Sequence, residues 1–177
     1  MTAGRGIVHA EMPGHSVDGV SSNIVAQCPV KSLTSSQAPN VGLQLWVDLP
    51  KHLKYCEPRY RDLHASEVPT ATADDNRVTI KVISGISQGV ESAQELAYTP
   101  VWILDVTMKP GGKLSQPLPK GWNAFAYTLE GDQMIFGENT KVGAYHNVVF
   151  AQTGDGIEVL VPDNAESPAR FGESEPS

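Results

Sequence analysis

The chain has 177 residues, 40% of them hydrophobic and 19% charged, which is enough to bury the core of one domain or of two small ones. Its 20 acidic and 13 basic residues give a net charge of -7, and no cluster of Lys and Arg offers the positive surface that binds nucleic acid, so we expect no direct nucleic-acid contact. No stretch approaches the roughly 18 apolar residues of a membrane span and no signal-peptide pattern opens the chain, so we expect an intracellular protein without membrane contact.

Apolar and polar residues alternate along most of the chain with the period of two that is typical of β-strands. In the first such stretch, "GIVHAE", the side chains of Ile7, His9 and Glu11 share one face. Gly and Pro turns separate the stretches, and helical periodicity is scarce. We therefore expect an all-β protein, a sandwich or a barrel, with strands within residues 6–11, 41–50, 77–85, 100–112, 122–136 and 148–162.

Two stretches depart from this pattern. Residues 14–40 are rich in Ser, Gly and Pro, and we expect a long loop there that is functional, disordered or inserted. Residues 163–177 are polar and acidic and contain Pro, and we expect a disordered tail. Cys28 and Cys56 stand far apart in the sequence. Two reduced thiols are the favoured interpretation, and one disulfide between them stays open.

The pair His9 and Glu11 is the first candidate for chemistry. On a strand, residues two apart point the same way, so an imidazole and a carboxylate would both face the barrel interior. Buried polar groups need compensation, and a divalent metal ion supplies it; His with a carboxylate suits iron, manganese or zinc. The alternative is a hydrogen-bonded histidine beside a solvated glutamate, and the spacing alone leaves both open.

The remaining histidines do not complete a metal site, because none of them forms an H-x-H pair. His15 lies just beyond the first strand and could swing back towards His9, whereas His52 and His64 are expected on the surface and His146 at a strand rim. The sequence also contains no phosphate-binding loop, no nucleophile elbow and no Ser-His-Asp or Cys-His arrangement.

Five sequence blocks, taken in order, resemble the pirin family: "MTAGRGIVHAEMP", "GLQLWVDLP", "EPRY", "VTIKVISG" and "SQPLPKGWNAFAYTLEGD". The resemblance spans residues 1–13 and 41–170. It implies a bicupin, two cupin β-barrels in tandem. We accordingly expect the remainder of an N-terminal, metal-binding cupin over 1–68, with the long loop at 14–40, and a C-terminal cupin over 69–162.

The resemblance also implies a metal. In the family an iron ion in the N-terminal barrel is bound by three histidines and one glutamate, and His9 and Glu11 match the histidine and glutamate of the "HAE" element. They are therefore the expected Fe(2+) ligands, with Glu11 alternatively the base that deprotonates a substrate. The other two histidines come from an H-x-H strand upstream of the first matched residue.

In the second barrel the family resemblance implies a metal-free domain. The place of the cupin ligands reads "PGGKLSQ", in which Leu114, Ser115 and Gln116 offer no imidazole. The family also continues beyond the position of Phe171. The expectation is thus a chain truncated at both ends, with an incomplete N-terminal barrel and a C-terminal barrel that lacks its last strands.

Three functions follow from the resemblance. The first is an oxygenase of the quercetin 2,3-dioxygenase type, with Fe(2+) and a flavonol substrate. The second is an iron-binding transcriptional co-regulator, a monomer in the nucleus and cytoplasm that acts on transcription-factor proteins of the NF-κB group through protein contacts. The third is a truncated, metal-free and catalytically inactive pirin isoform or fragment.

Overall fold

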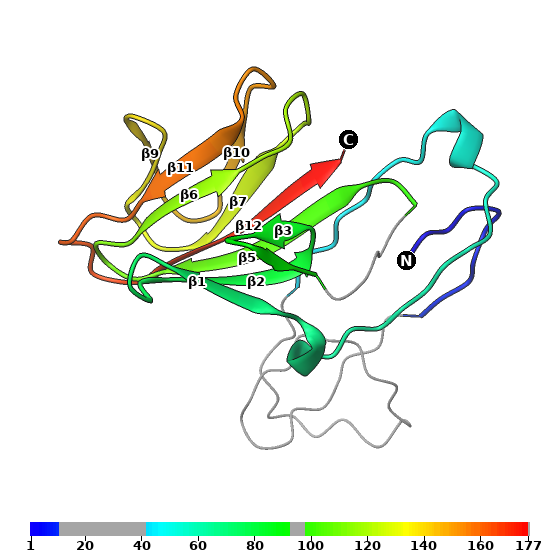
Figure 1. The fold of residues 1–177 in the computed structure, drawn as a ribbon, viewed down its shortest axis with the longest axis horizontal. Coiled ribbons are helices and arrows are strands. Elements are labelled where there is room, and N and C mark those ends of the chain that lie inside the picture. Colours follow the sequence, from blue (N-terminus) through cyan, green and yellow to red (C-terminus); the bar gives the residue numbers. More distant parts are fainter. Residues whose placement is uncertain (11–41, 93–97, 177) are drawn as a thin grey trace. The chain divides into compact units, whose positions relative to one another are not determined.

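The computed structural model describes residues 1–10, 42–92 and 98–176, with backbone alone described over 173–176. The chain forms two compact units, Met1–Glu67 and Val68–Ser177 (Figure 1). Within the described residues, no helix is long and apolar enough to cross a membrane.

The N-terminal unit contains little regular structure in its described part. Two short 3-10 helices, η1 (Lys51–Leu53) and η2 (Ala65–Glu67), interrupt an otherwise irregular chain. The first residues are held against a later segment by a β-bridge, in which the N–H of Thr2 donates to the Arg59 carbonyl at 2.7 Å and the N–H of Arg59 donates back at 2.9 Å.

A glycine allows this close approach. Gly4 has a φ of 50°, and a Cβ on it would lie 2.2 Å from the carbonyl oxygen of Cys56. A larger residue would therefore push the two segments apart. Cys56 is a half-buried free thiol.

The strands expected within 6–11 and 41–50 do not form in the described parts of those ranges, 6–10 and 42–50. That expectation is wrong for these residues. Alternating side chains specify two faces, but a strand also needs a neighbouring backbone to pair with. Within the described part of this unit, the Thr2–Arg59 bridge is the sole pairing of that kind.

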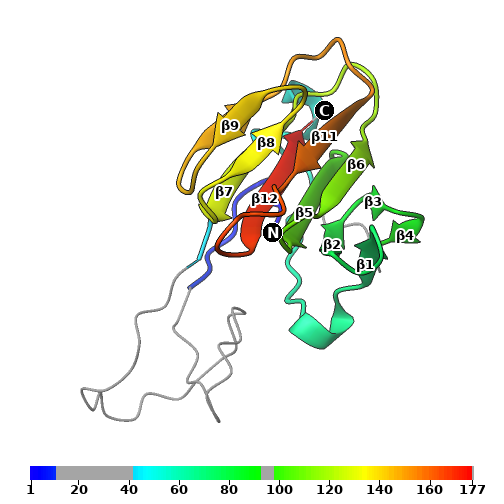
Figure 2. The same cartoon turned by 90° about the vertical axis from the view of Figure 1, so that its left-hand side faces the viewer.

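The C-terminal unit is built from strands, which confirms the all-β expectation (Figures 1 and 2). Its described strands are β1 (Thr70–Ala73), β2 (Val78–Ser84), β3 (Ile86–Ser87), β4 (Val90–Glu91), β5 (Val101–Met108), β6 (Lys113–Pro117), β7 (Phe125–Glu130), β8 (Met134–Phe136), β9 (Thr140–Val142), β10 (Asn147–Val149), β11 (Gly156–Leu160) and β12 (Ala169–Pro176).

These strands form two open antiparallel sheets. The first has six strands in the order β1-β2-β5-β12-β7-β10, and the second has four in the order β6-β11-β8-β9. Strands β3 and β4 form a separate hairpin. Crossovers between distant strands place the sequence neighbours β5 and β6 in different sheets, so the chain passes back and forth across the core.

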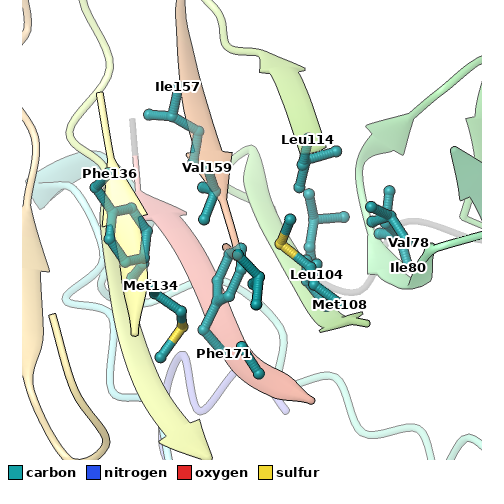
Figure 3. Close-up of a cluster of buried hydrophobic side chains, with 14 of the residues drawn as sticks. Val78, Ile80, Leu104, Met108, Leu114, Met134, Phe136, Ile157, Val159 and Phe171 are labelled. Carbon is teal, nitrogen blue, oxygen red and sulfur yellow. The ribbon is translucent and has the colours of Figure 1, made fainter. Parts of the chain in front are cut away.

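The core lies between the two sheets. Along β2 the buried side chains are Val78, Ile80 and Val82, as the alternation predicts. Figure 3 shows side chains from both sheets meeting in one cluster, in which the Phe136 and Phe171 rings pack edge to face with centroids 5.5 Å apart. Burial of this apolar surface stabilises the unit.

The end of the chain differs from the expected disordered tail. Ala169–Pro176 form β12, which pairs with β5 along its whole length and with β7 on its other side. The expectation for 163–177 is wrong for these residues. Polar, acidic composition predicts disorder only where the backbone has no partner, and here two strands offer one, while Ala169 and Phe171 face the core.

Candidate functional site

His9 lies on the segment that follows the Gly4 turn. Its side chain is exposed, as is that of Val8, whereas Ile7 is half-buried. Glu11 and His15 lie outside the described residues, so the pairing of His9 with either stays a prediction. The described segment 6–10 is not a strand, so it does not present His9 from the wall of a barrel.

The other described histidines are exposed, as expected. His52 lies on η1, His64 precedes η2, and His146 precedes β10, where its ring Nδ1 lies 2.8 Å from the Ala144 carbonyl oxygen. Over residues 1–10, 42–92 and 98–176, no group of three or more His, Cys, Asp or Glu side chains could hold a metal ion.

Among the described residues, Glu67 is the carboxylate with a clearly shifted pKa. The backbone N–H of His64 donates to Glu67 Oε2 at 2.8 Å, and the Arg61 guanidinium lies 3.4 Å from Oε1. The hydrogen bond from His64, assisted by Arg61, lowers the pKa of Glu67 below its ordinary value. This arrangement caps η2, because the side chain satisfies an N–H at the start of the turn.

In the C-terminal unit, Leu114 and Gln116 lie at the place that the family resemblance gives to the cupin ligands, and both are buried. The Ser87 hydroxyl donates to Gln116 Oε1 at 2.6 Å, and Gln116 Nε2 donates to the carbonyls of Ile86 and Pro117 at 3.2 and 2.9 Å. The amide thus has protein partners on both its oxygen and its nitrogen. Its role is to attach the β3–β4 hairpin to β6.

Sequence reasoning missed a charged cluster on the six-stranded sheet. Arg170 of β12 donates to both carboxylate oxygens of Asp105 on β5, at 2.9 and 2.8 Å, and Lys81 of β2 lies 3.7 Å from the same carboxylate. The hydrogen bonds to Asp105 raise the pKa of Arg170 further above its ordinary value. No local motif signals this contact, since 65 positions separate the pair.

Comparison with known proteins places this fold. Residues 103–171 match the model of the Pirin C-terminal cupin domain. Pirin-1 of Arabidopsis thaliana is 39% identical over 161 residues, 90% of this chain and 47% of its own, and human Pirin is 39% identical over 169 residues, 94% of this chain and 50% of its own.

The chain belongs to the pirin family. This pirin-family chain spans about half the length of the curated relatives that it matches.

Solved structures agree on the fold. A Geobacillus kaustophilus protein, GK1651, superposes with a TM-score of 0.66 at 29% identity, covering 75% of this pirin-family chain and 52% of that chain. A quercetin 2,3-dioxygenase from Acinetobacter baumannii superposes with a TM-score of 0.65 at 21% identity, covering 75% and 44%. At that identity the second likeness shows a shared cupin fold alone.

Proposed function

We propose that this pirin-family chain is a non-catalytic, protein-binding co-regulator. The observation that carries the proposal is the apolar core of the C-terminal unit, to which both sheets contribute side chains. Among the described residues of this unit, no group of three or more His, Cys, Asp or Glu side chains could hold a metal ion. A non-haem oxygenase requires a metal with open coordination positions and room for its substrate. A packed core of this kind suits a scaffold that presents its outer surface to a partner.

Three buried polar side chains of the C-terminal unit support the same interpretation. Gln116 and Ser87 bond to each other, and the Thr128 hydroxyl donates to the Gly143 carbonyl at 2.7 Å. These groups are neutral and already form hydrogen bonds within the protein, so they stabilise the fold and are not available to bind a ligand.

Iron is the cofactor that the pirin resemblance implies, with His9 and Glu11 as its ligands. The residues that the structure describes do not fit such a site, because His9 is exposed and no group of three donors lies together among them. One imidazole does not hold an iron ion, since affinity depends on several preorganised ligands.

The partner class in this proposal is a transcription factor of the NF-κB group, met in the nucleus or cytoplasm. The net charge of -7 supports contact with protein surfaces and argues against the phosphate backbone of nucleic acid. Binding should then be independent of metal.

The test is binding of the purified full chain to a purified NF-κB-group factor, measured by calorimetry with and without a chelator. The proposal predicts the same dissociation constant in both conditions, and weaker binding at higher salt because the charges are exposed. An absence of binding, or binding that needs added Fe(II), would contradict it. A chain with Ala in place of His9 is the matched control, and it should bind as the unaltered chain does.

A second candidate is an iron-dependent oxygenase of the quercetin 2,3-dioxygenase type. It is favoured by the cupin fold shared with the Acinetobacter enzyme and by the H-x-E element at His9 and Glu11. Here the chain is reconstituted anaerobically with Fe(II), desalted and analysed for metal. Near one iron per chain, lost in both His9→Ala and Glu11→Ala, would support this candidate; no retained iron would support the non-catalytic one.

A further inference from the structure

Two places in the chain have a serine or threonine directly before a proline, and they differ in burial. They are Thr99–Pro100, before β5, and Ser167–Pro168, in the loop between β11 and β12. Proline-directed protein kinases recognise this dipeptide through the proline, which has a fixed φ and no backbone N–H. The sequence offers both hydroxyl groups equally, so the fold decides which of them an enzyme can reach.

The fold closes off Thr99. Its side chain is 6% exposed, and Oγ1 is buried without a hydrogen-bond partner among the described residues. A hydroxyl that solvent does not reach cannot enter the active site of a kinase while the chain is folded. Strand β5 begins two residues later, at Val101, so local opening at Thr99 would also disturb the six-stranded sheet.

Ser167 has the opposite environment. The side chains of Glu166, Ser167 and Pro168 are exposed, and these three residues make no backbone hydrogen bond within the part of the chain that the structure describes. A residue that precedes proline favours an extended backbone, which is the form that a kinase groove binds. The Ser167 hydroxyl therefore lies on backbone that an enzyme can engage without breaking a strand.

We propose that Ser167 is a phosphorylation site for a proline-directed serine kinase. Such an enzyme transfers the γ-phosphoryl group of Mg²⁺-bound ATP to Ser167 Oγ. A bond between the serine oxygen and phosphorus forms, the bond between the γ-phosphorus and the ADP oxygen breaks, and the hydroxyl proton passes to a base of the kinase. Thr99 remains unmodified in the folded chain.

The loop belongs to the domain that this chain contains. It lies within residues 103–171, which match the Pirin C-terminal cupin domain. The strands that it joins, β11 and β12, are each paired on both sides, with β6 and β8 and with β5 and β7. The exposure of Ser167 is therefore that of a connection between two paired strands, and not that of an unpaired sheet edge.

Phosphorylation changes the charge of this loop. A phosphoserine adds about −1.5 to −2 charges, and residues 161–168 already carry Asp163 and Glu166 and no Lys or Arg. The next cation along the chain is Arg170, which donates to both carboxylate oxygens of Asp105. We therefore expect the phosphate to add negative charge to the surface beside β12 while the sheet stays paired. This inference does not depend on the proposed partner binding.

The test treats the purified full chain with a mitogen-activated protein kinase and Mg²⁺-ATP, and tandem mass spectrometry counts and locates the phosphate. We expect close to one phosphate per chain, on Ser167, and none on Thr99. Ser167→Ala should abolish this labelling. Pro168→Ala keeps the hydroxyl and removes the proline, so the initial rate of labelling should fall about tenfold or more.

The matched control is Thr99→Val, which removes the other hydroxyl that precedes a proline and keeps the shape of the side chain. It should accept phosphate as the unaltered chain does. Ser167 and Pro168 are exposed, so their substitutions leave the core intact, and unchanged circular dichroism spectra verify this. No phosphate on the unaltered chain, phosphate on Thr99 of the folded chain, or undiminished labelling in Ser167→Ala or Pro168→Ala would each overturn the proposal.

Discussion

Arg170 of β12 donates two parallel hydrogen bonds to Asp105 of the neighbouring strand β5, at 2.9 and 2.8 Å. The carboxylate is largely shielded, with a side chain 16% exposed, whereas that of Arg170 is 31% exposed. A fork-to-fork pair of this kind is stronger than a single ion pair, because it fixes geometry as well as charge. The pair connects β12, the last described strand, to its neighbour β5 in the six-stranded sheet.

Asp105→Ala should lower the free energy of unfolding by about 1 kcal/mol, since Arg170 is partly solvated and recovers some hydration. Urea denaturation measures the change. Lys81→Ala, which removes the weaker contact at 3.7 Å, is the control and should cost no more than about 0.5 kcal/mol. Equal losses in the two variants would mean that the paired geometry contributes nothing beyond charge.

Phe171→Ala tests whether β12 is part of the folded core. Phe171 is fully buried and packs against Phe136 at a centroid distance of 5.5 Å. Removing a buried aromatic ring costs roughly 3–5 kcal/mol through lost burial and the cavity left behind. A loss of that size in urea denaturation is expected. A change near zero would instead indicate that the chain end is disordered, as its composition suggests.

The sequence predicts the strands correctly where an alternating segment also has a neighbouring strand to pair with. Alternation identifies β2 and the buried faces that Val78, Ile80 and Val82 supply, because a half-buried strand fixes its pattern locally. Alternation also predicts a strand at 42–50, but none forms there, because no described backbone pairs with this segment. At β12 the opposite error occurs: the polar composition predicts disorder, but a strand forms because β5 and β7 both pair with it.

The candidate site is predicted less well than the fold. His9 is located as an exposed residue on an irregular segment, and the position of Glu11 lies outside the described residues. Metal ligation depends on side chains brought together by tertiary structure, and two residues in one short motif do not specify the rest. The Arg170–Asp105 pair cannot be predicted from the sequence either, because nothing in the local sequence around one residue identifies the other as its partner.

Ser87→Ala should destabilise the C-terminal unit through Gln116. The substitution removes the donor to Gln116 Oε1, an atom of a side chain that is only 1% exposed. A buried acceptor left without a partner costs about 1–3 kcal/mol. Urea denaturation of the variant should show that loss.

The control for this prediction is Thr99→Val. Thr99 Oγ1 is buried without a hydrogen-bond partner among the described residues, so replacing the hydroxyl by a methyl group should leave stability unchanged or raise it by about 1 kcal/mol. If Thr99→Val destabilised the unit as much as Ser87→Ala, lost packing and not a lost hydrogen bond would explain both.

Gly85→Ala should disrupt the tryptophan pair beside the β3–β4 hairpin. Gly85 has a φ of 95°, and a Cβ on it would lie 2.3 Å from Cγ of Trp102, whose ring packs edge to face on Trp122 at 5.8 Å. We expect a loss of about 3 kcal/mol and a changed near-ultraviolet circular dichroism signal. Gly89→Ala isolates the backbone contribution, since its φ is 77° and no atom lies within 4 Å, and it should cost only about 1 kcal/mol. Similar losses in both variants would contradict the steric role of Trp102.

The hydrogen bond between the Glu67 carboxylate and the His64 N–H should be lost at acid pH, when the carboxylate is protonated. The carboxylate accepts the hydrogen bond from the His64 N–H, which lowers the folded-state pKa below the ordinary 4.5. A group with a depressed folded pKa stabilises the folded state above its unfolded pKa and loses that effect as the pH falls through the folded pKa. The amide ¹H shift of His64, followed by NMR, should therefore change with a midpoint below 4.5. In Glu67→Gln this inflection should disappear, because the amide does not titrate; a midpoint at or above 4.5 in the unaltered chain would show that the hydrogen bond does not form in solution.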